Sequence, residues 1–141
     1  MKNLCLLTLC GFLAGTLLAT FKPVYGIDAF KKEFINKYVK KESTEPTEKA
    51  FADAVKAANC NVCHAGKTNK KTRNEYGRAL DELLDKKADI KNAAKIQDVL
   101  EKVAGEKSDP KNPASPTFGE LIKQGKLPGG EVSAATAAAG N

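Results

Sequence analysis

The run Cys60-Asn61-Val62-Cys63-His64 brings two thiols and an imidazole into one short stretch of the chain. Two cysteines three positions apart on one local turn can reach two neighbouring vinyl groups on the edge of one macrocycle, and C-x-x-C-H is the pattern of covalent haem attachment. His64 directly follows the second cysteine, where it can offer a ring nitrogen to the iron as the proximal ligand. It is also the only histidine in the chain. The sequence therefore predicts one haem, bound by two thioethers and ligated by His64.

A C-x-x-C pair also occurs in three other kinds of protein site. A zinc site usually needs four protein ligands, and only three Cys and His side chains remain once the N-terminal segment described next is removed. A thioredoxin-like redox pair needs a βαβ context, and no segment near the motif has the pattern of a strand. A disulfide between Cys60 and Cys63 would close a very small loop and add little stability. Haem attachment is favoured, and a bare disulfide or dithiol is the main alternative.

The N-terminal segment indicates the compartment. Lys2 precedes an almost wholly apolar run, 4–19, and the small-residue segment 24–26 follows. A short basic region, an apolar stretch of this length and a small-residue cleavage point are typical of a secretory signal peptide. We therefore expect a signal peptide over 1–26, a mature chain that begins at Ile27, and export to the periplasm or an equivalent compartment. An uncleaved anchor is the alternative, although the run is short for a membrane span.

Cleavage would leave Cys60 and Cys63 as the only cysteines. It would also lower the formal net charge from +6 to +4, because the removed segment carries two lysines and no acidic residue. The remaining lysines alternate with acidic residues, and few aromatic residues lie among them, so the sequence does not predict a nucleic-acid partner. A basic rim that docks an acidic redox protein and an ordinary solvated surface both explain the remaining charge.

Apolar residues recur at spacings of three and four along the mature chain, which predicts helices. The segment that holds three prolines, 108–116, is excluded from a helix interior. No segment shows convincing strand alternation, so we expect an all-α domain over 27–130, with about five helices, no sheet and one haem. The Ala- and Thr-rich end, 131–141, predicts a disordered tail. The expected helices are 27–41, 47–59, 75–86, a fourth that carries Ile96–Val103 and stops at Gly105, and 118–124.

Capping residues and glycines refine this prediction. The expected N-caps are Thr44 or Thr47, Asn74, Asp89 or Asn92, and Thr117 for the last four helices. The second helix runs directly into Cys60, with small residues on its apolar face that would let it approach a flat partner. Gly77, in the first turn of the next helix, would allow close approach of another backbone or of the haem. Between these helices, the basic segment 65–73 is interpreted as a solvated loop, with a haem-propionate neighbour, a partner patch or a lysine that reaches the iron as alternatives.

The motif and its helical context resemble a small exported monohaem c-type cytochrome. The specific part of the resemblance covers Asn59–His64, and the wider context extends to about Leu84. The resemblance implies thioether bonds at Cys60 and Cys63, proximal ligation by His64 and redox partner proteins. Class I cytochromes take a methionine from a later loop as the distal ligand, whereas the only methionine here is Met1. Class II cytochromes leave the distal position open but carry the motif near the end of a four-helix bundle, so the chain departs from both patterns.

The sixth position of the iron therefore has no obvious occupant. The sequence leaves three options: a vacant or water-filled site, a lysine, or Tyr76. Lys126 lies in a Gly-Lys-Leu-Pro turn after an apolar helix, a place along the chain similar to that of a class I distal loop. A lysine ligand must be neutral, and burial beside the iron favours the neutral form. The absence of an axial methionine suggests a lower reduction potential.

Two functions follow from these expectations. The favoured one is a soluble electron carrier that cycles between ferric and ferrous iron and is not an enzyme. The alternative is a haem-based protein or sensor that binds a small gas such as NO or CO at an open distal site. Peroxidase-like catalysis is disfavoured because no distal histidine is available for acid–base chemistry.

Overall fold

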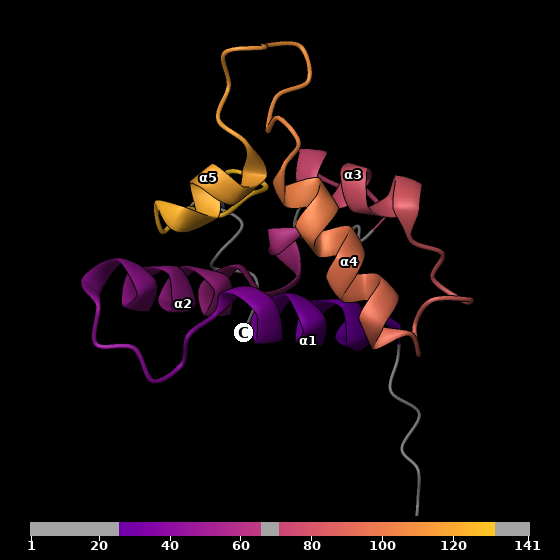
Figure 1. Ribbon diagram of the computed structural model, residues 1–141, viewed down its shortest axis with the longest axis horizontal. Coiled ribbons are helices and arrows are strands. Elements are labelled where there is room, and N and C mark those ends of the chain that lie inside the picture. Colours follow the sequence, from indigo (N-terminus) through magenta and orange to yellow (C-terminus); the bar gives the residue numbers. More distant parts are fainter. Residues whose placement is uncertain (1–25, 66–70, 132–141) are drawn as a thin grey trace, which may run out of the picture.

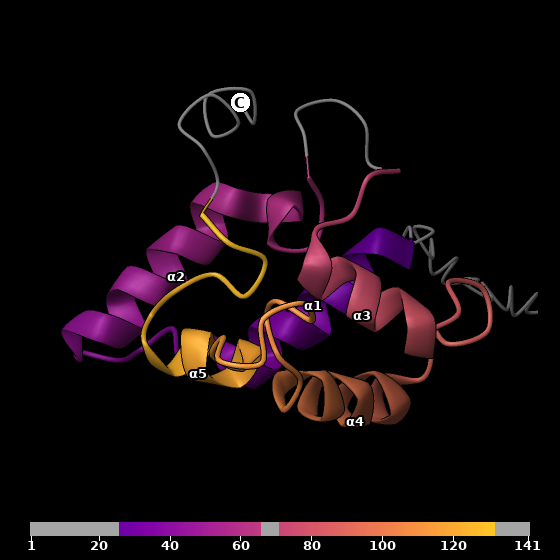
Figure 2. The ribbon, with the colours of Figure 1, turned by 90° about the horizontal axis from the view of Figure 1, so that it is seen from above.

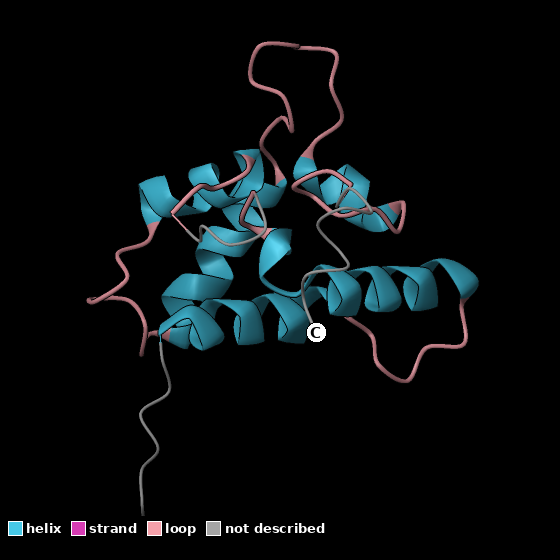
Figure 3. Cartoon of the chain, turned by 180° about the vertical axis from the view of Figure 1, so that it is seen from behind, coloured by secondary structure: helices cyan, strands magenta, loops and turns pink. Residues whose placement is uncertain are grey.

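The computed structural model describes residues 26–65 and 71–131. Within these ranges the chain forms five α-helices and one short 3₁₀ helix, and the only bridge pairings are the isolated ones between His64 and Arg73 and between Lys107 and Thr117. The prediction of an all-α domain without a sheet is confirmed (Figure 3). The elements are α1 Gly26–Tyr38, α2 Pro46–Ala58, η1 Asn59–Val62, α3 Glu75–Leu83, α4 Ala93–Ala104 and α5 Phe118–Lys123 (Figure 1). The predicted signal peptide and tail lie outside the described residues, except for their inner ends.

Three of the expected N-caps are present. Asn74 accepts a hydrogen bond from the N–H of Gly77, Asn92 caps α4 in the same way, and Thr117 forms a capping box with Glu120. Each bond satisfies a backbone N–H that the first turn of a helix leaves without a partner. Asn92, not Asp89, is therefore the cap of α4.

The expected threonine cap of α2 is wrong. Glu45 occupies the N-cap position without a side-chain hydrogen bond, and Pro46 begins the helix. Proline suits this position because it lacks the N–H that a cap would satisfy and its φ angle is already helical. The helix α1 ends at Tyr38 and α3 at Leu83, three residues before the predicted ends in each case.

Helix α4 contacts α1, α3 and α5 and lies along the lower edge of the view in Figure 2. Side chains join α1 to α4 over a long separation in sequence. The hydroxyl of Tyr38 donates to the carbonyl of Leu100 at 2.8 Å, and the amide of Gln97 donates to the Glu33 carboxylate at 2.7 Å. The proline-rich segment between α4 and α5 projects away from the helices as a loop, as the sequence predicts (Figure 1).

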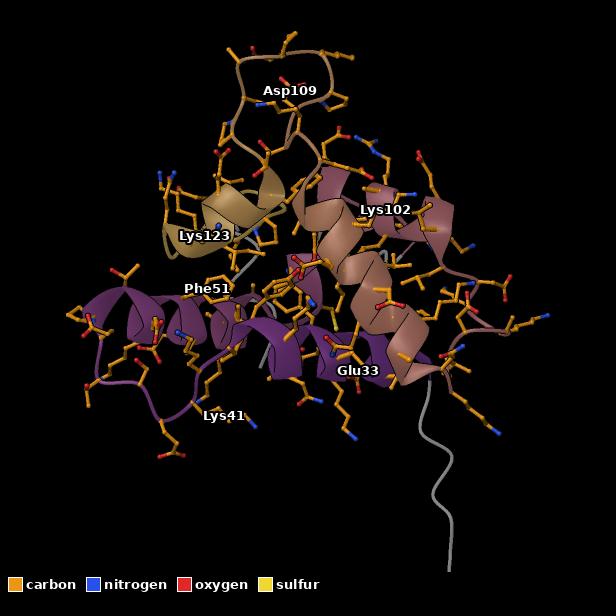
Figure 4. All side chains as sticks on the ribbon, in the orientation of Figure 1. Glu33, Lys41, Phe51, Lys102, Asp109 and Lys123 are labelled. Carbon is orange, nitrogen blue, oxygen red and sulfur yellow. The ribbon has the colours of Figure 1, made fainter. Side chains whose placement is uncertain are left out.

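Aromatic rings connect the helices inside the core. The ring of Tyr76 lies between those of Phe34 and Phe118, with centroid separations of 5.8 and 5.1 Å. Phe51 of α2 is also buried, whereas labelled charged residues such as Lys41, Lys102 and Lys123 are exposed (Figure 4). The buried apolar residues are Phe34, Phe51, Val55, Ala58, Val62, Tyr76, Leu80, Leu84, Ile96, Val99, Leu100, Val103 and Phe118. None of the helices in the described residues has the length and apolar character that crossing a membrane would require.

Candidate functional site

The C-x-x-C-H motif lies on a tight turn that follows α2. Asn59 leaves the α-helix with a φ of 51°, in the left-handed region that asparagine tolerates better than most residues. The chain then continues as η1, and the N–H groups of Cys63 and His64 donate to the carbonyl of Cys60 at 3.3 and 3.1 Å. The three predicted site residues are therefore held together by local backbone hydrogen bonds.

These three residues line one pocket. The pocket has about 860 Å³ of empty space, part of it open to solvent, and includes Cys60, Cys63 and His64. The structure thus brings the predicted attachment and ligand residues together with three helices distant in sequence. The apolar part of the lining includes Phe30 and Phe34 of α1, Leu80 of α3, Leu84, and Ile96 and Leu100 of α4.

A backbone carbonyl orients the imidazole. The Nδ1 atom of His64 lies 3.3 Å from the carbonyl oxygen of Thr72. A proton on Nδ1 that points to this oxygen leaves the lone pair on Nε2, and a hydrogen bond of this kind is how proteins usually orient a metal-ligating histidine. The same carbonyl accepts a hydrogen bond from the N–H of Ala65 at 3.1 Å. The two ends of the predicted basic loop, whose residues 66–70 lie outside the described residues, are thereby joined beside the motif.

Both cysteines are free thiols, so the alternative of a disulfide between them is not formed. The thiol of Cys60 donates to the side-chain oxygen of Asn59 at 3.7 Å. Burial raises the pKa of the Cys63 thiol to about 12, the nearby Cys60 adds to this, and Arg73 opposes it. Cys63 is therefore a neutral thiol at physiological pH. Among the described residues, no group of three or more His, Cys, Asp or Glu side chains is arranged to hold a metal ion.

Helix α3 begins in very close contact with the motif. A Cβ atom at Gly77 would lie 1.9 Å from the carbonyl oxygen of Cys63, so the expectation that this glycine allows close approach of another backbone is confirmed. Asn74 reinforces the contact, because its side-chain amide donates to the carbonyls of Asn61 and Val62 at 3.2 and 3.0 Å. The sequence predicts the capping role of Asn74 but carries no signal for this second role.

Polar residues from separate parts of the chain also line the pocket. Arg73 and Asp81 form an ion pair at 2.6 Å, and the amine of Lys31 donates to the side-chain oxygen of Asn59 at 2.5 Å. Lys86, which follows α3, lies on the same pocket. Sequence reasoning included Arg73 only as part of the basic loop and missed the others, because nothing in their local pattern distinguishes them from surface residues.

The two speculative distal ligands lie elsewhere. Lys126 lines a second cavity, with Ala54, Ala57 and other residues of α2 and the C-terminal region. Tyr76 is fully buried in the aromatic core, and its hydroxyl has no hydrogen-bond partner among the residues that the structure describes. Burial raises the pKa of Tyr76 well above its usual value, so the phenol is neutral. The structure brings neither side chain to the pocket that contains His64.

The chain was compared with known proteins at three levels. No family model, no curated protein and no solved structure matches it. The functional assignment therefore depends on the motif and on the geometry of its pocket.

Proposed function

We propose that this protein is an exported c-type cytochrome that carries electrons through one covalently attached haem. Cys60 and Cys63 would form the thioether bonds, and His64 would be the proximal ligand of the iron. The observation that carries the proposal is that all three residues line a single pocket whose remaining lining is largely apolar. A haem needs this combination, because its iron takes an imidazole nitrogen while most of the macrocycle is apolar.

The individual groups fit this cofactor. The two sulfurs are not joined in a disulfide. The Nδ1 atom of His64 faces a carbonyl oxygen in the manner of a metal-ligating histidine. Bound haem would supply a one-electron iron couple, and the apolar side chains would exclude water and tune its potential.

Binding of a small gas is the second candidate. It is favoured by the composition of the pocket, whose described lining contains no methionine, no tyrosine and no histidine other than His64. An iron that keeps an open sixth position would bind CO or NO. Optical spectra of the reduced protein before and after CO addition distinguish this function from electron transfer alone.

The proposal is tested by producing the full chain in cells that mature c-type cytochromes. We expect the purified protein to carry the mass of one haem, to give the pyridine haemochrome spectrum of haem c and to titrate reversibly between two oxidation states. Its N-terminus should be Ile27 if the predicted signal peptide is removed.

The matched variants are C60A/C63A and N61A. The double cysteine variant should contain no covalent haem, whereas N61A should keep it, because Asn61 is a variable position of the motif. A wild-type protein without haem in such cells, or with haem that denaturation releases, would contradict the proposal.

A further inference from the structure

The pocket that contains His64 limits which side chains can complete the coordination of a haem iron. Of its described residues, the candidates besides the motif are the amines of Lys31 and Lys86 and the carboxylate of Asp81. The Asp81 carboxylate is engaged by Arg73 at 2.6 Å. Lys126, the candidate favoured by position along the chain, lies on the other cavity. Among the residues that the structure describes, the choice is therefore between two lysines.

Lys31 is held on the attachment side of the pocket. Its amine donates to the side-chain oxygen of Asn59 at 2.5 Å, and Asn59 directly precedes the first thioether cysteine. To act as an iron ligand, this amine would have to give up that hydrogen bond. Lys31 is therefore the less suitable of the two amines.

Lys86 differs from Lys31 in its place in the chain and in the partners of its amine. It lies in the connection between α3 and α4, two residues after the buried Leu84, and its exposed side chain lines the pocket from a different part of the chain than the motif. Its amine forms no hydrogen bond or ion pair with the residues that the structure describes. A lysine amine on a long flexible stem, next to an apolar pocket and without a partner, is available as a donor.

The backbone around Lys86 is nonetheless well fixed. The Asp85 carboxylate accepts hydrogen bonds from the N–H groups of Lys87 and Ala88, both at 2.7 Å. The N–H of Asp85 in turn donates to the carboxylate of Asp89 at 2.8 Å. These bonds hold the turn that carries Lys86 at the end of α3 and leave its amine unengaged. A ligand position benefits from such a support, because less flexibility is lost when the bond to the metal forms.

From this arrangement we propose that Lys86 would provide the sixth ligand of the iron. The inference rests on the covalent haem proposed above and goes beyond it by naming the distal ligand. On ligation the lysine ammonium loses its proton to solvent, and its nitrogen lone pair forms the bond to iron, with no change in oxidation state. Two nitrogen ligands would make the iron low-spin and close the site to CO.

The test compares optical and electron paramagnetic resonance spectra of haem-loaded wild type, K86A, K86R and K87A. Lys87 is the matched control, since it is the adjacent exposed lysine and does not line the pocket. We expect low-spin spectra that CO does not change in the wild type and in K87A. K86A and K86R should become high-spin and bind CO when reduced. K86R keeps the positive charge but cannot give up its proton to act as a ligand, so it separates ligation from a loss of surface charge.

Three results would overturn the inference. In the first, K86A and K86R keep the wild-type spectrum. In the second, K31A, K126A or Y76F removes the low-spin signal instead. In the third, the wild type itself is high-spin and binds CO. The pyridine haemochrome assay on the same samples separates these results from failure of the proposed function. Wild-type protein without covalent haem overturns both proposals, whereas haem-loaded protein with an open iron overturns only the assignment of Lys86.

Discussion

The contact between Gly77 and the motif depends on the absence of a single carbon atom. We predict that Gly77→Ala lowers the free energy of unfolding by about 1–3 kcal/mol, as overpacking at a rigid contact does. The added Cβ would lie 1.9 Å from a backbone oxygen, so α3 or the motif must move. Urea unfolding of the haem-loaded protein measures the effect, and haem content measures the disturbance of the motif.

Gly105→Ala is the control for this prediction. Its Cβ would lie 3.4 Å from the nearest atom, the carbonyl oxygen of Lys102, and its φ of −78° suits any residue. We expect a change within about 0.5 kcal/mol, as for most surface substitutions. Equal unfolding midpoints for the two variants would show that the contact at Gly77 is not rigid.

At the scale of elements, the turn between α3 and α4 depends on a buried carboxylate. Asp89 accepts hydrogen bonds from the amine of Lys95 at 2.7 Å and from the N–H of Asp85 at 2.8 Å. Both bonds lower the pKa of Asp89 below its usual 3.8, and the bond from Lys95 has the larger effect. The ionised form is therefore stabilised by folding, and its contribution is present above the unfolded-state pKa and is lost as the pH falls through the folded-state pKa.

We predict that Asp89→Asn destabilises the fold at neutral pH and that the difference from wild type shrinks in acid. Urea unfolding at about pH 7 and about pH 2.5 tests this, because the carboxyl is ionised at the first pH, and at the second the unfolded chain binds a proton there more readily than the folded chain. Asp98→Asn is the control, since Asp98 is exposed on α4 and has no partner among the described residues. A difference between wild type and D89N that stays constant with pH would rule out the charge as its cause.

Helix positions and caps were largely predictable because their causes are local. The caps at Asn74, Asn92 and Thr117 each bond to an N–H three residues away. The cap of α2 was not predicted correctly, because Pro46 replaces the usual hydrogen bond with a preset φ angle. The early end of α1 at Tyr38 was missed because no glycine or proline, the usual marks of a helix end, occurs between Tyr38 and Pro46.

At the scale of the whole molecule, many residues of the hydrophobic core also line the pocket. The buried core residues that also line the pocket are Phe34, Val55, Val62, Leu80, Leu84, Ile96 and Leu100. Because these side chains belong to the core and also line the pocket, a chain without haem leaves their pocket side unfilled. Unfilled apolar space destabilises a core, since the surrounding atoms lose contacts.

We predict that the C60A/C63A variant folds poorly without haem. Its far-ultraviolet circular dichroism should show less helix than the haem-loaded protein, and its unfolding by urea should begin at lower concentration and be less cooperative. The N61A protein, loaded with haem, is the control. A double variant with the circular dichroism and urea midpoint of the haem-loaded protein would show that the helices pack stably around an empty pocket.

The sequence by itself determined the features whose causes lie within a few residues: the helices, most of their caps, the role predicted for Gly77 and the Cys60–His64 motif. Tertiary structure decided which distant residues meet that motif. It brought Lys31, Arg73 and Lys86 to the pocket, and it put Lys126 on a different cavity despite its position along the chain. The physical reason is that hydrogen bonds and capping act over one turn, whereas the lining of a pocket depends on how helices far apart in sequence pack together.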